Sequence, residues 1–399
     1  MAARFNLASD AFFQDPVGTV ARARAKGPVV PAKFPLIGDV WITTTYEATA
    51  RVLKDAAAFP LRKNGAVAGL RWWMPKSITV FANNMLTSDE PDHTRLRGLV
   101  DEAFRRRAVL EMEPDISAIA DELAGQLFAE GTPADLVMCY ARILPLSVIC
   151  ELLGLPLADR PTFIGWANML ATFTSPMGFV RTVGAMKKMR RYMEGRLKIA
   201  RERGGEGLIA ELARLEKEGG RISHDELVTM LFLLLIAGSE TTTHLISGAV
   251  FELLKDPARR DWLEADWNRA GLAVEEFLRF VSAVQLSKPR FVREDMELEG
   301  VRLKKGDRIM ALIVAANFDA AANDHPETLE LDRHPNRHLA FGTGSHFCLG
   351  HQLARIEAVC GLRALFTRYP KLRLAVEPSA IRWRKRPGLR AIDKLPVAA

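Results

Sequence analysis

The longest regular pattern of apolar positions runs from residue 223 to residue 255. Ser223 and Glu226 have the spacing of a capping box at a helix start, and Pro257 predicts where the helix ends. The first half of this stretch is apolar on nearly every side, which predicts a buried helix. At about 1.5 Å per residue, the helix would be long enough to cross a whole domain. These features predict a mostly α-helical protein with one long central helix.

Shorter patterns predict the other elements. Residues 40–44 are rich in β-branched and aromatic side chains and predict a strand, whereas residues 46–54 predict a helix. Prolines at positions 28, 31 and 35 predict a loop before that strand. Residues 108–222 have the spacing of several amphipathic helices, and residues 289–316 predict strands and turns. After residue 369 the chain is expected to return to strands.

The composition excludes several classes of protein. Of the 399 residues, 48% are hydrophobic and 26% charged, as in ordinary globular proteins. We expect neither a secretion signal nor a membrane anchor, because the N-terminus has no apolar core and the longest apolar run, residues 230–237, is short. The four cysteines lack zinc or disulfide spacing, which predicts a cytoplasmic location. The net charge of +7 can indicate nucleic acid, a membrane surface or an acidic protein partner. No pattern typical of nucleic-acid binding accompanies it, and solvated surface charge is the simplest interpretation.

The most informative stretch for chemistry is residues 341–350, which hold Gly342, Gly344, Gly350 and Cys348. An amphipathic helical pattern follows and stops before residue 370. Backbone N–H groups at a helix start favour a thiolate over a thiol. A buried structural cysteine is the alternative. A nucleotide-binding P-loop fits poorly, because no Gly-Lys-Ser/Thr follows the glycines.

Three other groups of residues suggest a site. His93 and Arg97 share one helical face and could bind an anion, although a solvated basic face is the simpler interpretation. Within the long helix, residues 237–242 combine a glycine with a buried glutamate, which indicates either a site or a local bend with a hydrogen-bonded Glu. Glu276 and Arg279 form an i,i+3 pair that by itself means little.

The order Phe-x-x-Gly-x-x-x-Cys-x-Gly at residues 341–350 resembles the haem-binding loop of the cytochrome P450 family. The three other groups resemble further motifs of that family, in the family's order, and the resemblance extends from about residue 30 to the end. It implies one domain over residues 1–399, mostly α with a small β-rich region near the N-terminus. Haem b would lie between the long central helix and the helix after the cysteine loop.

The resemblance assigns the residues that would hold the haem. Cys348 would be the axial thiolate ligand of the iron, with Phe341 packed beside the sulfur. The N–H groups around Leu349 and Gly350 would donate to the sulfur, and Gly342 and Ala237 would line the haem site. The candidates for binding the haem propionates are His93, Arg97, Arg290, His338 and His346.

The resemblance also assigns residues to oxygen chemistry and to structure. Gly238 would make room for O2, and Glu240 and Thr241 would deliver protons through water. A buried charge network would join Glu276, Arg279 and Arg333. Phe318 stands where the family usually has arginine, and we expect it to be a local surface difference.

The substrate pocket is expected to be apolar. Residues 59–81 would cover it and residues 387–389 would turn into it. The candidates for its lining are Trp72, Trp73, Phe81, Leu233, Ala237, Leu286 and Leu389. They carry no charge, which favours a hydrophobic small molecule such as a terpenoid, a steroid or an aromatic compound.

These features together predict a monomeric monooxygenase that hydroxylates its substrate with O2. Electrons would come from NAD(P)H through a ferredoxin reductase and a ferredoxin, which would dock at the basic cluster of residues 105–107. Two alternatives stay open: a peroxide-driven oxygenase, and a haem-binding or sensor protein without turnover. Binding to nucleic acid is a distant third possibility.

Overall fold

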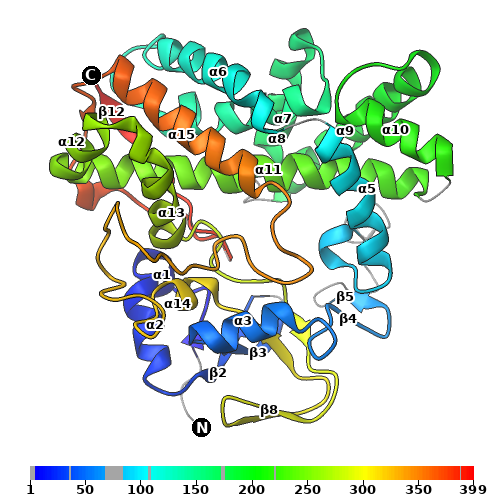
Figure 1. Ribbon diagram of the computed structural model, residues 1–399, viewed down its shortest axis with the longest axis vertical. Coiled ribbons are helices and arrows are strands. Elements are labelled where there is room, and N and C mark those ends of the chain that lie inside the picture. Colours follow the sequence, from blue (N-terminus) through cyan, green and yellow to red (C-terminus); the bar gives the residue numbers. More distant parts are fainter. Residues whose placement is uncertain are drawn as a thin grey trace.

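The long central helix is present as α11 (His224–Lys255), which runs across the helical part of the molecule (Figure 1). Its first turn is held by the expected capping box, because the Ser223 hydroxyl accepts from the Glu226 N–H and the Glu226 carboxylate accepts from the Ser223 N–H at 2.8 Å. The prediction of this helix is confirmed. The computed structural model describes residues 5–35, 37–67, 84–106, 109–171, 176–219, 222–386 and 388–399.

Helices surround α11 on several sides. It contacts α7 (Ile143–Leu153), α9 (Pro176–Arg203), α13 (Ala270–Val281) and α15 (His351–Arg368). Among the described residues, α11 is the one helix long and apolar enough to cross a membrane, but 67% of its apolar window is buried inside the protein. Its hydrophobicity is therefore explained by its place in the core.

The helices between residues 108 and 222 agree with the predicted amphipathic patterns, whereas a short helix at Ile313–Asn317 lies where strands and turns were predicted, which corrects that expectation. The other α-helices are α1 (Asp10–Gln14), α2 (Pro16–Arg24), α3 (Tyr46–Lys54), α5 (Asp92–Arg106), α6 (Glu113–Gln126), α8 (Arg160–Ala171), α10 (Leu208–Gly219), α12 (Pro257–Ala265) and α14 (Ile313–Asn317). Short 3-10 or π-helical segments lie at Met85–Thr87, Val109–Met112, Val137–Ala141, Leu157–Asp159, Trp267–Arg269 and Pro378–Ala380. The helix predicted over residues 46–54 is confirmed with its bounds.

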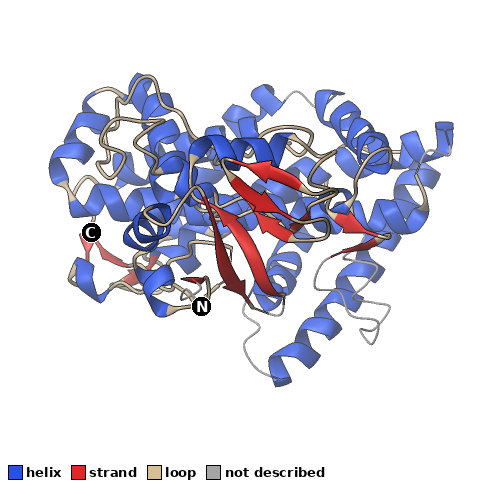
Figure 2. Cartoon of the chain, turned by 90° about the horizontal axis from the view of Figure 1, so that it is seen from below, coloured by secondary structure: helices blue, strands red, loops and turns tan. Residues whose placement is uncertain are grey.

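A second layer below the helices contains the main sheet (Figures 1 and 2). Its order is β1 (Phe5–Asn6), β2 (Val29–Phe34), β3 (Gly38–Thr43), β10 (Arg308–Met310) and β7 (Arg290–Phe291). The predicted small β-rich region is confirmed. It combines three strands of the N-terminal segment with two from residues 289–316, where strands were also predicted.

The remaining strands form small separate sheets. β12 (Pro396–Ala398) lies between β11 (Arg373–Leu374) and β6 (Ala134–Asp135) and pairs antiparallel with both. Two further strand pairs are β4 (Arg62–Lys63) with β5 (Ala66–Val67), and β8 (Met296–Leu298) with β9 (Val301–Leu303). The expected return to strands after residue 369 is confirmed.

The loop predicted before β3 is wrong, because Pro31 lies inside β2 and pairs with Trp41. Val29, Val30 and Ala32 are buried, so apolar burial favours the strand. Pro31 itself is exposed, and the neighbouring strand β1 pairs only beyond it. A proline at such a partly unpaired strand edge removes little of the hydrogen-bonded ladder.

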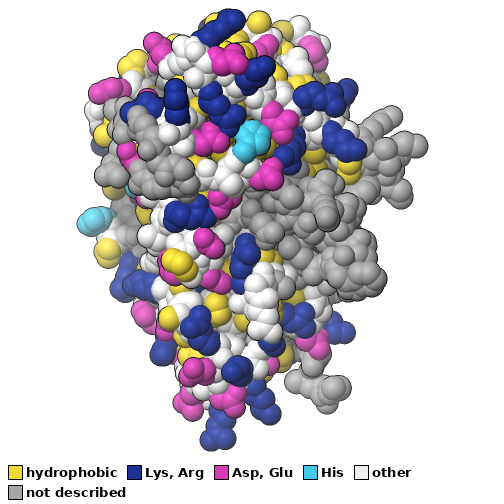
Figure 3. Space-filling view, turned by 90° about the vertical axis from the view of Figure 1, so that its right-hand side faces the viewer, with side chains coloured by type: hydrophobic (Ala, Val, Ile, Leu, Met, Phe, Trp, Pro, Cys, Tyr) yellow, Lys and Arg dark blue, Asp and Glu magenta, His cyan; other side chains and the backbone are white. Residues whose placement is uncertain are grey.

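The surface mixes charges of both signs. On the face shown in Figure 3, Lys and Arg side chains are interspersed with Asp and Glu. Several arginines are paired across elements, such as Arg190 with Asp225 and Arg201 with Glu216. This arrangement favours solvated surface charge over a broad basic field for nucleic acid.

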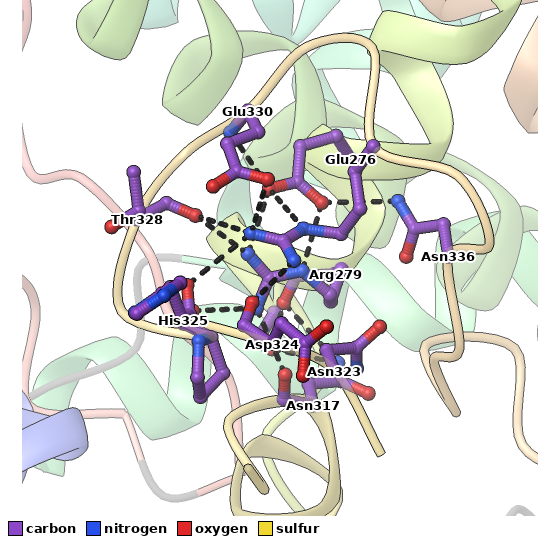
Figure 4. Close-up of polar contacts among 12 residues, drawn as sticks. Glu276, Arg279, Asn317, Asn323, Asp324, His325, Thr328, Glu330 and Asn336 are labelled. Carbon is purple, nitrogen blue, oxygen red and sulfur yellow. Dashed lines mark hydrogen bonds and ion pairs between the residues drawn. The ribbon is translucent and has the colours of Figure 1, made fainter.

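The charge network lies beneath the segment that leads to the cysteine loop (Figure 4). Glu276 and Arg279 have fully buried side chains and form two hydrogen bonds of 2.7 and 2.8 Å. Arg333 adds a third at 3.2 Å, and the Asn336 amide donates to the same carboxylate. Both guanidinium groups also donate to backbone carbonyls of residues 317–328. The carboxylate therefore fixes the course of this loop.

Phe318 does not belong to the surface, which corrects the expectation for this position. It is 5% exposed, and its ring packs against the tilted ring of Phe280 with 5.5 Å between the centroids. The Arg279 guanidinium lies 5.3 Å from the Phe318 ring centroid. An aromatic ring here covers the charge network with apolar surface, so the departure from the family pattern belongs to the core.

Replacing Glu276 by Ala should strongly destabilise the protein. Buried Arg279 would lose its counter-charge and Arg333 would lose one of its two acidic partners, and breaking such a buried pair typically costs about 3–5 kcal/mol. Glu330→Ala is the matched control, since Glu330 pairs with the same Arg333 but is 41% exposed, and it should cost under about 1 kcal/mol. Urea unfolding of both haem-loaded variants, or the yield of haem-loaded protein, measures the difference. Equal losses would show that the buried carboxylate has no special role.

Candidate active site

The cysteine loop is pressed against the end of α3. Gly344 has φ +78°, and a Cβ atom there would lie 2.9 Å from the Leu53 carbonyl oxygen and from the Lys54 Cα. Only glycine fits both the backbone conformation and this approach. The Cys348 N–H donates to the Phe341 carbonyl at 2.9 Å and closes the loop just before α15 begins.

Cys348 is half-buried, and its surroundings act on its charge in opposite directions. Burial raises the pKa of the Cys348 thiol, while a hydrogen bond from the Gly350 N–H and the charges of Arg97 and Arg355 lower it. Among the residues described, no three His, Cys, Asp or Glu side chains are grouped to hold a metal ion. A single thiolate ligand suits a metal that arrives with its other ligands already in place, as in a porphyrin.

Four of the five propionate candidates lie together. The rings of His93 and His346 are 4.0 Å apart, and Arg97 donates to the Phe347 carbonyl beside Cys348 at 2.8 Å. Burial lowers the pKa of His346 to about 3, and the charges of His93, Arg290 and Arg97 add to this effect. Arg290 is buried, and its Nε–H has no partner in the described part of the chain. An unpaired donor in a group of cations suits an anion.

His338, the fifth candidate, does not join this group. Its Nε2 lies 3.0 Å from a carboxylate oxygen of Glu275, and its Nδ1 accepts from the Ala340 N–H. Both ring nitrogens are therefore occupied, which corrects the expectation that His338 binds a propionate. His338 instead joins the cysteine loop to α13.

Glu275 and Arg355 are site residues that the motifs did not indicate. Arg355 donates twice to Glu275, and its guanidinium lies 4.6 Å from the Phe341 ring centroid. Burial would raise the pKa of Glu275, but hydrogen bonds from His338 and Arg355 lower it to about 2. The pair links α13 to α15 on the thiolate side. The one feature of the sequence that could have indicated this pair is that Glu275 directly precedes Glu276.

The middle of α11 is exposed although most of the helix is buried. Ile236 is 42% exposed, Ala237 is exposed, and Thr241 is half-buried with its hydroxyl donating to the Ala237 carbonyl at 2.9 Å. A Cβ at Gly238 would be 3.5 Å from Ile149, which is ordinary contact, so packing does not require a glycine. The middle of α11 is therefore accessible, in contrast to the rest of the helix.

Glu240 is not free, because Arg386 forms a two-pronged ion pair with it. The Arg386 Nη2 is 2.6 Å from the Glu240 Oε2, and the Nη1 contacts the other oxygen. One turn further, His244 is buried and neither ring nitrogen has a partner among the described residues. Burial and nearby arginines, Arg386 first among them, lower the pKa of His244 to about 3. The basic run 382–386 was the signal for Arg386 in the sequence.

The pocket candidates are only partly brought together. A Cβ at Gly388 would lie 3.6 Å from Leu286, and the next residue, Leu389, forms a bridge with Val284. Ala237 is exposed on α11, whereas Leu233 is half-buried and packs against the main core. Trp72, Trp73 and Phe81 lie outside the described residues.

Comparisons with known proteins agree with this arrangement. Residues 272–373 match the family model described as Cytochrome P450. The polyketide biosynthesis cytochrome P450 PksS of Bacillus subtilis is 35% identical over 394 residues, covering 97% of this chain and 96% of PksS. The chain belongs to the cytochrome P450 family. The vitamin D(3) 25-hydroxylase of Pseudonocardia autotrophica is 38% identical over 393 residues, covering 98% of this chain and 96% of that enzyme.

Solved structures confirm the P450 fold. The PksS structure superimposes with a TM-score of 0.89 at 34% identity and covers 99% of both chains. A myxobacterial cytochrome P450 in complex with myristic acid gives a TM-score of 0.88 at 34% identity, covering 98% of both chains. The protein is therefore a P450 monooxygenase, and its cofactor is haem b.

The residues of this site fit haem b. Cys348 would hold the iron, and the grouped donors of His93, Arg97, Arg290 and His346 would hold the propionates. The unpaired Arg290 Nε–H is the observation that tests this fit, because a bound carboxylate would supply the missing acceptor.

Glu357 on α15 is a further buried acid near the exposed stretch of α11. Burial raises its pKa to about 8, against a hydrogen bond with Thr242 that lowers it. Its Oε2 has no partner within the described ranges. The carboxyl group is therefore mostly protonated at neutral pH.

The stability of the protein should depend on the titration of Glu357. Since the pKa of about 8 in the folded protein exceeds the ordinary 4.5, the folded state binds the extra proton and loses stability as pH rises between these values. Glu357→Gln keeps the shape of the side chain without titrating. Thermal midpoints are measured at pH 5, 7 and 9. The midpoint of the variant minus that of the native protein should increase as pH rises. A constant difference at all three pH values would contradict the assignment.

Proposed function

We propose that this P450 hydroxylates a hydrophobic small molecule with O2 and electrons from a ferredoxin, as a soluble, cytoplasmic, monomeric, single-domain enzyme. The observation that supports it best is the exposed stretch of α11, which combines Ala237, Gly238 and Thr241 with the acid Glu240. A core helix bears such groups at a cost, because polar side chains must be satisfied there.

Haem supplies the oxygen-activating chemistry when it is bound. The chain's own part is to exclude water, hold the substrate and move protons. The Thr241 hydroxyl donates to the Ala237 carbonyl and can exchange this bond for one to an incoming group. Both Glu240 oxygens are occupied by Arg386, so Glu240 can pass a proton only when this ion pair opens.

The apolar lining supports a hydrophobic substrate. Leu286, Leu389 and Ala237 offer no charge to a ligand, and the 35% and 38% identical relatives are named for polyketide biosynthesis and for hydroxylation of vitamin D(3). We infer a substrate with an extended or fused apolar skeleton, such as a polyketide, terpenoid or steroid.

The thiolate side supports a docking face for an acidic ferredoxin. Phe347 is 37% exposed beside Cys348, and Arg97, His351 and Arg355 surround it. This apolar centre with a basic rim suits a partner that brings acidic groups. Of the predicted cluster at residues 105–107, the first two end α5 but their side chains, like residue 107, lie outside the description.

Peroxide-driven turnover is the second candidate. The presence of both Glu240 and Thr241 favours use of O2, because these two groups serve proton delivery. Efficient product formation with H2O2 alone, without reductant, would favour the peroxide-driven enzyme instead.

A substrate panel should identify the class of ligand. We expect a polyketide, terpenoid or steroid to convert the ferric haem absorbance to the high-spin form, because an apolar ligand displaces water from the site. Small aromatics and fatty acids form the comparison arms. A shift only with those arms would refute the inferred skeleton.

Thr241→Ala should uncouple reductant use from product formation by about tenfold or more, the usual scale of a lost proton-transfer group. Thr243→Ala is the matched control, since its hydroxyl makes the same type of bond, to the Ser239 carbonyl at 2.9 Å, but is buried. NADH consumed, hydrogen peroxide released and product formed are measured together. Equal coupling in both variants would remove Thr241 from the proton path.

A further inference from the structure

Lys288 is a cation with no acidic partner within 4.0 Å among the described residues. Its side chain is exposed, whereas Pro289 and Arg290 next to it are buried. Protein atoms nevertheless surround the ammonium group, and burial lowers the pKa of Lys288. The backbone on either side of Lys288 decides whether this side chain faces the site.

The backbone around Lys288 is fixed on both sides. The Ser287 N–H donates to the Ala311 carbonyl, and the Ala311 N–H donates to the Ser287 hydroxyl, both at 2.9 Å. Two residues after Lys288, Arg290 pairs with Ile309 in the sheet. The position of Lys288 is thus set by the main sheet and not by a free loop.

The direction of the side chain follows from the local sequence. A residue before proline is restricted to extended conformations, so Pro289 keeps Lys288 extended. In an extended chain, side chains two residues apart point to the same side. Lys288 therefore points to the same side of the chain as Arg290. Leu286, two residues earlier, is a candidate for the apolar pocket, so Lys288 lies next to that pocket.

The cations grouped with Arg290 already have acids nearby. Arg97 is 3.0 Å from Asp101, and His93 is 3.3 Å from Glu90. Asp89 is the acid whose charge acts on Arg290. These acids offset part of the positive charge of the group, whereas Lys288 has no acid within 4.0 Å among the described residues.

We propose that Lys288 binds a carboxylate inside the site, at the boundary between the apolar pocket and the group of His93, Arg97, Arg290 and His346. The carboxylate belongs either to a haem propionate or to an acidic group on the proposed apolar substrate, for which a fatty acid serves as the probe. The inference rests on the proposed haem and substrate positions, but its test needs no turnover.

The first arm of the test removes the charge. Lys288→Met should release haem to excess apomyoglobin about tenfold faster, the usual scale of a lost hydrogen bond to a charged group. Its reduction potential should become more negative, because a positive charge near the haem favours the reduced state. Lys288→Arg should resemble the native protein, and Lys305→Met, which removes the same charge from an exposed turn, should change neither quantity. Reconstitution with haem dimethyl ester should abolish the difference.

The second arm tests the substrate as the source. Myristic acid and 1-tetradecanol are titrated against native protein and Lys288→Met by haem absorbance. If the substrate supplies the carboxylate, the variant should bind the acid about tenfold more weakly and the alcohol equally, with haem release unchanged. The proposal is wrong if Lys288→Met matches Lys305→Met in haem release, in reduction potential and in the preference for the acid over the alcohol. Loss of O2-dependent turnover with these readouts intact would count against the proposed function and not against Lys288.

Discussion

Two adjacent acids on α13 hold the loop that carries Cys348. Glu276 is buried between Arg279 and Arg333 and fixes the segment before the loop. Glu275 binds His338 at the start of the loop and Arg355 on the helix after it. Because neighbouring residues on a helix point in different directions, one turn of α13 holds both ends of the loop. The position of the thiolate depends on these two carboxylates.

The physical difference between the two acids is their exposure to water. Glu276 is fully desolvated, so every oxygen lone pair needs a donor and the arrangement is fixed. Glu275 retains 31% exposure and can tolerate movement. A rigid anchor before the loop is thus combined with a more adaptable one beside the face where a redox partner would dock.

At the centre of α11, polar groups lie on a helix that is otherwise mostly buried. Most of this helix is buried, yet Glu240 and Thr241 sit where Ile236 and Ala237 are exposed. The charge of Glu240 is tolerated because Arg386 arrives from a turn near the C-terminus. That turn is itself tied to residues 283–285 by backbone hydrogen bonds, so the Glu240–Arg386 ion pair and the segment 283–285 share one support.

The sequence by itself determined the elements that depend on local signals. The capping box and stop of α11, the helix 46–54 and the cysteine loop were predicted because caps, periodicity and glycine spacing act within a few residues. The grouping of His93, Arg97, Arg290 and His346 followed from family motifs. Pairings between distant residues were decided only by the tertiary structure: Arg386 with Glu240, His338 with Glu275, and β10 beside β3. Burial decided the rest, since nothing local distinguishes a core Phe318 from a surface one or shows that Pro31 lies in a strand. Such choices depend on which surfaces meet when the whole chain folds.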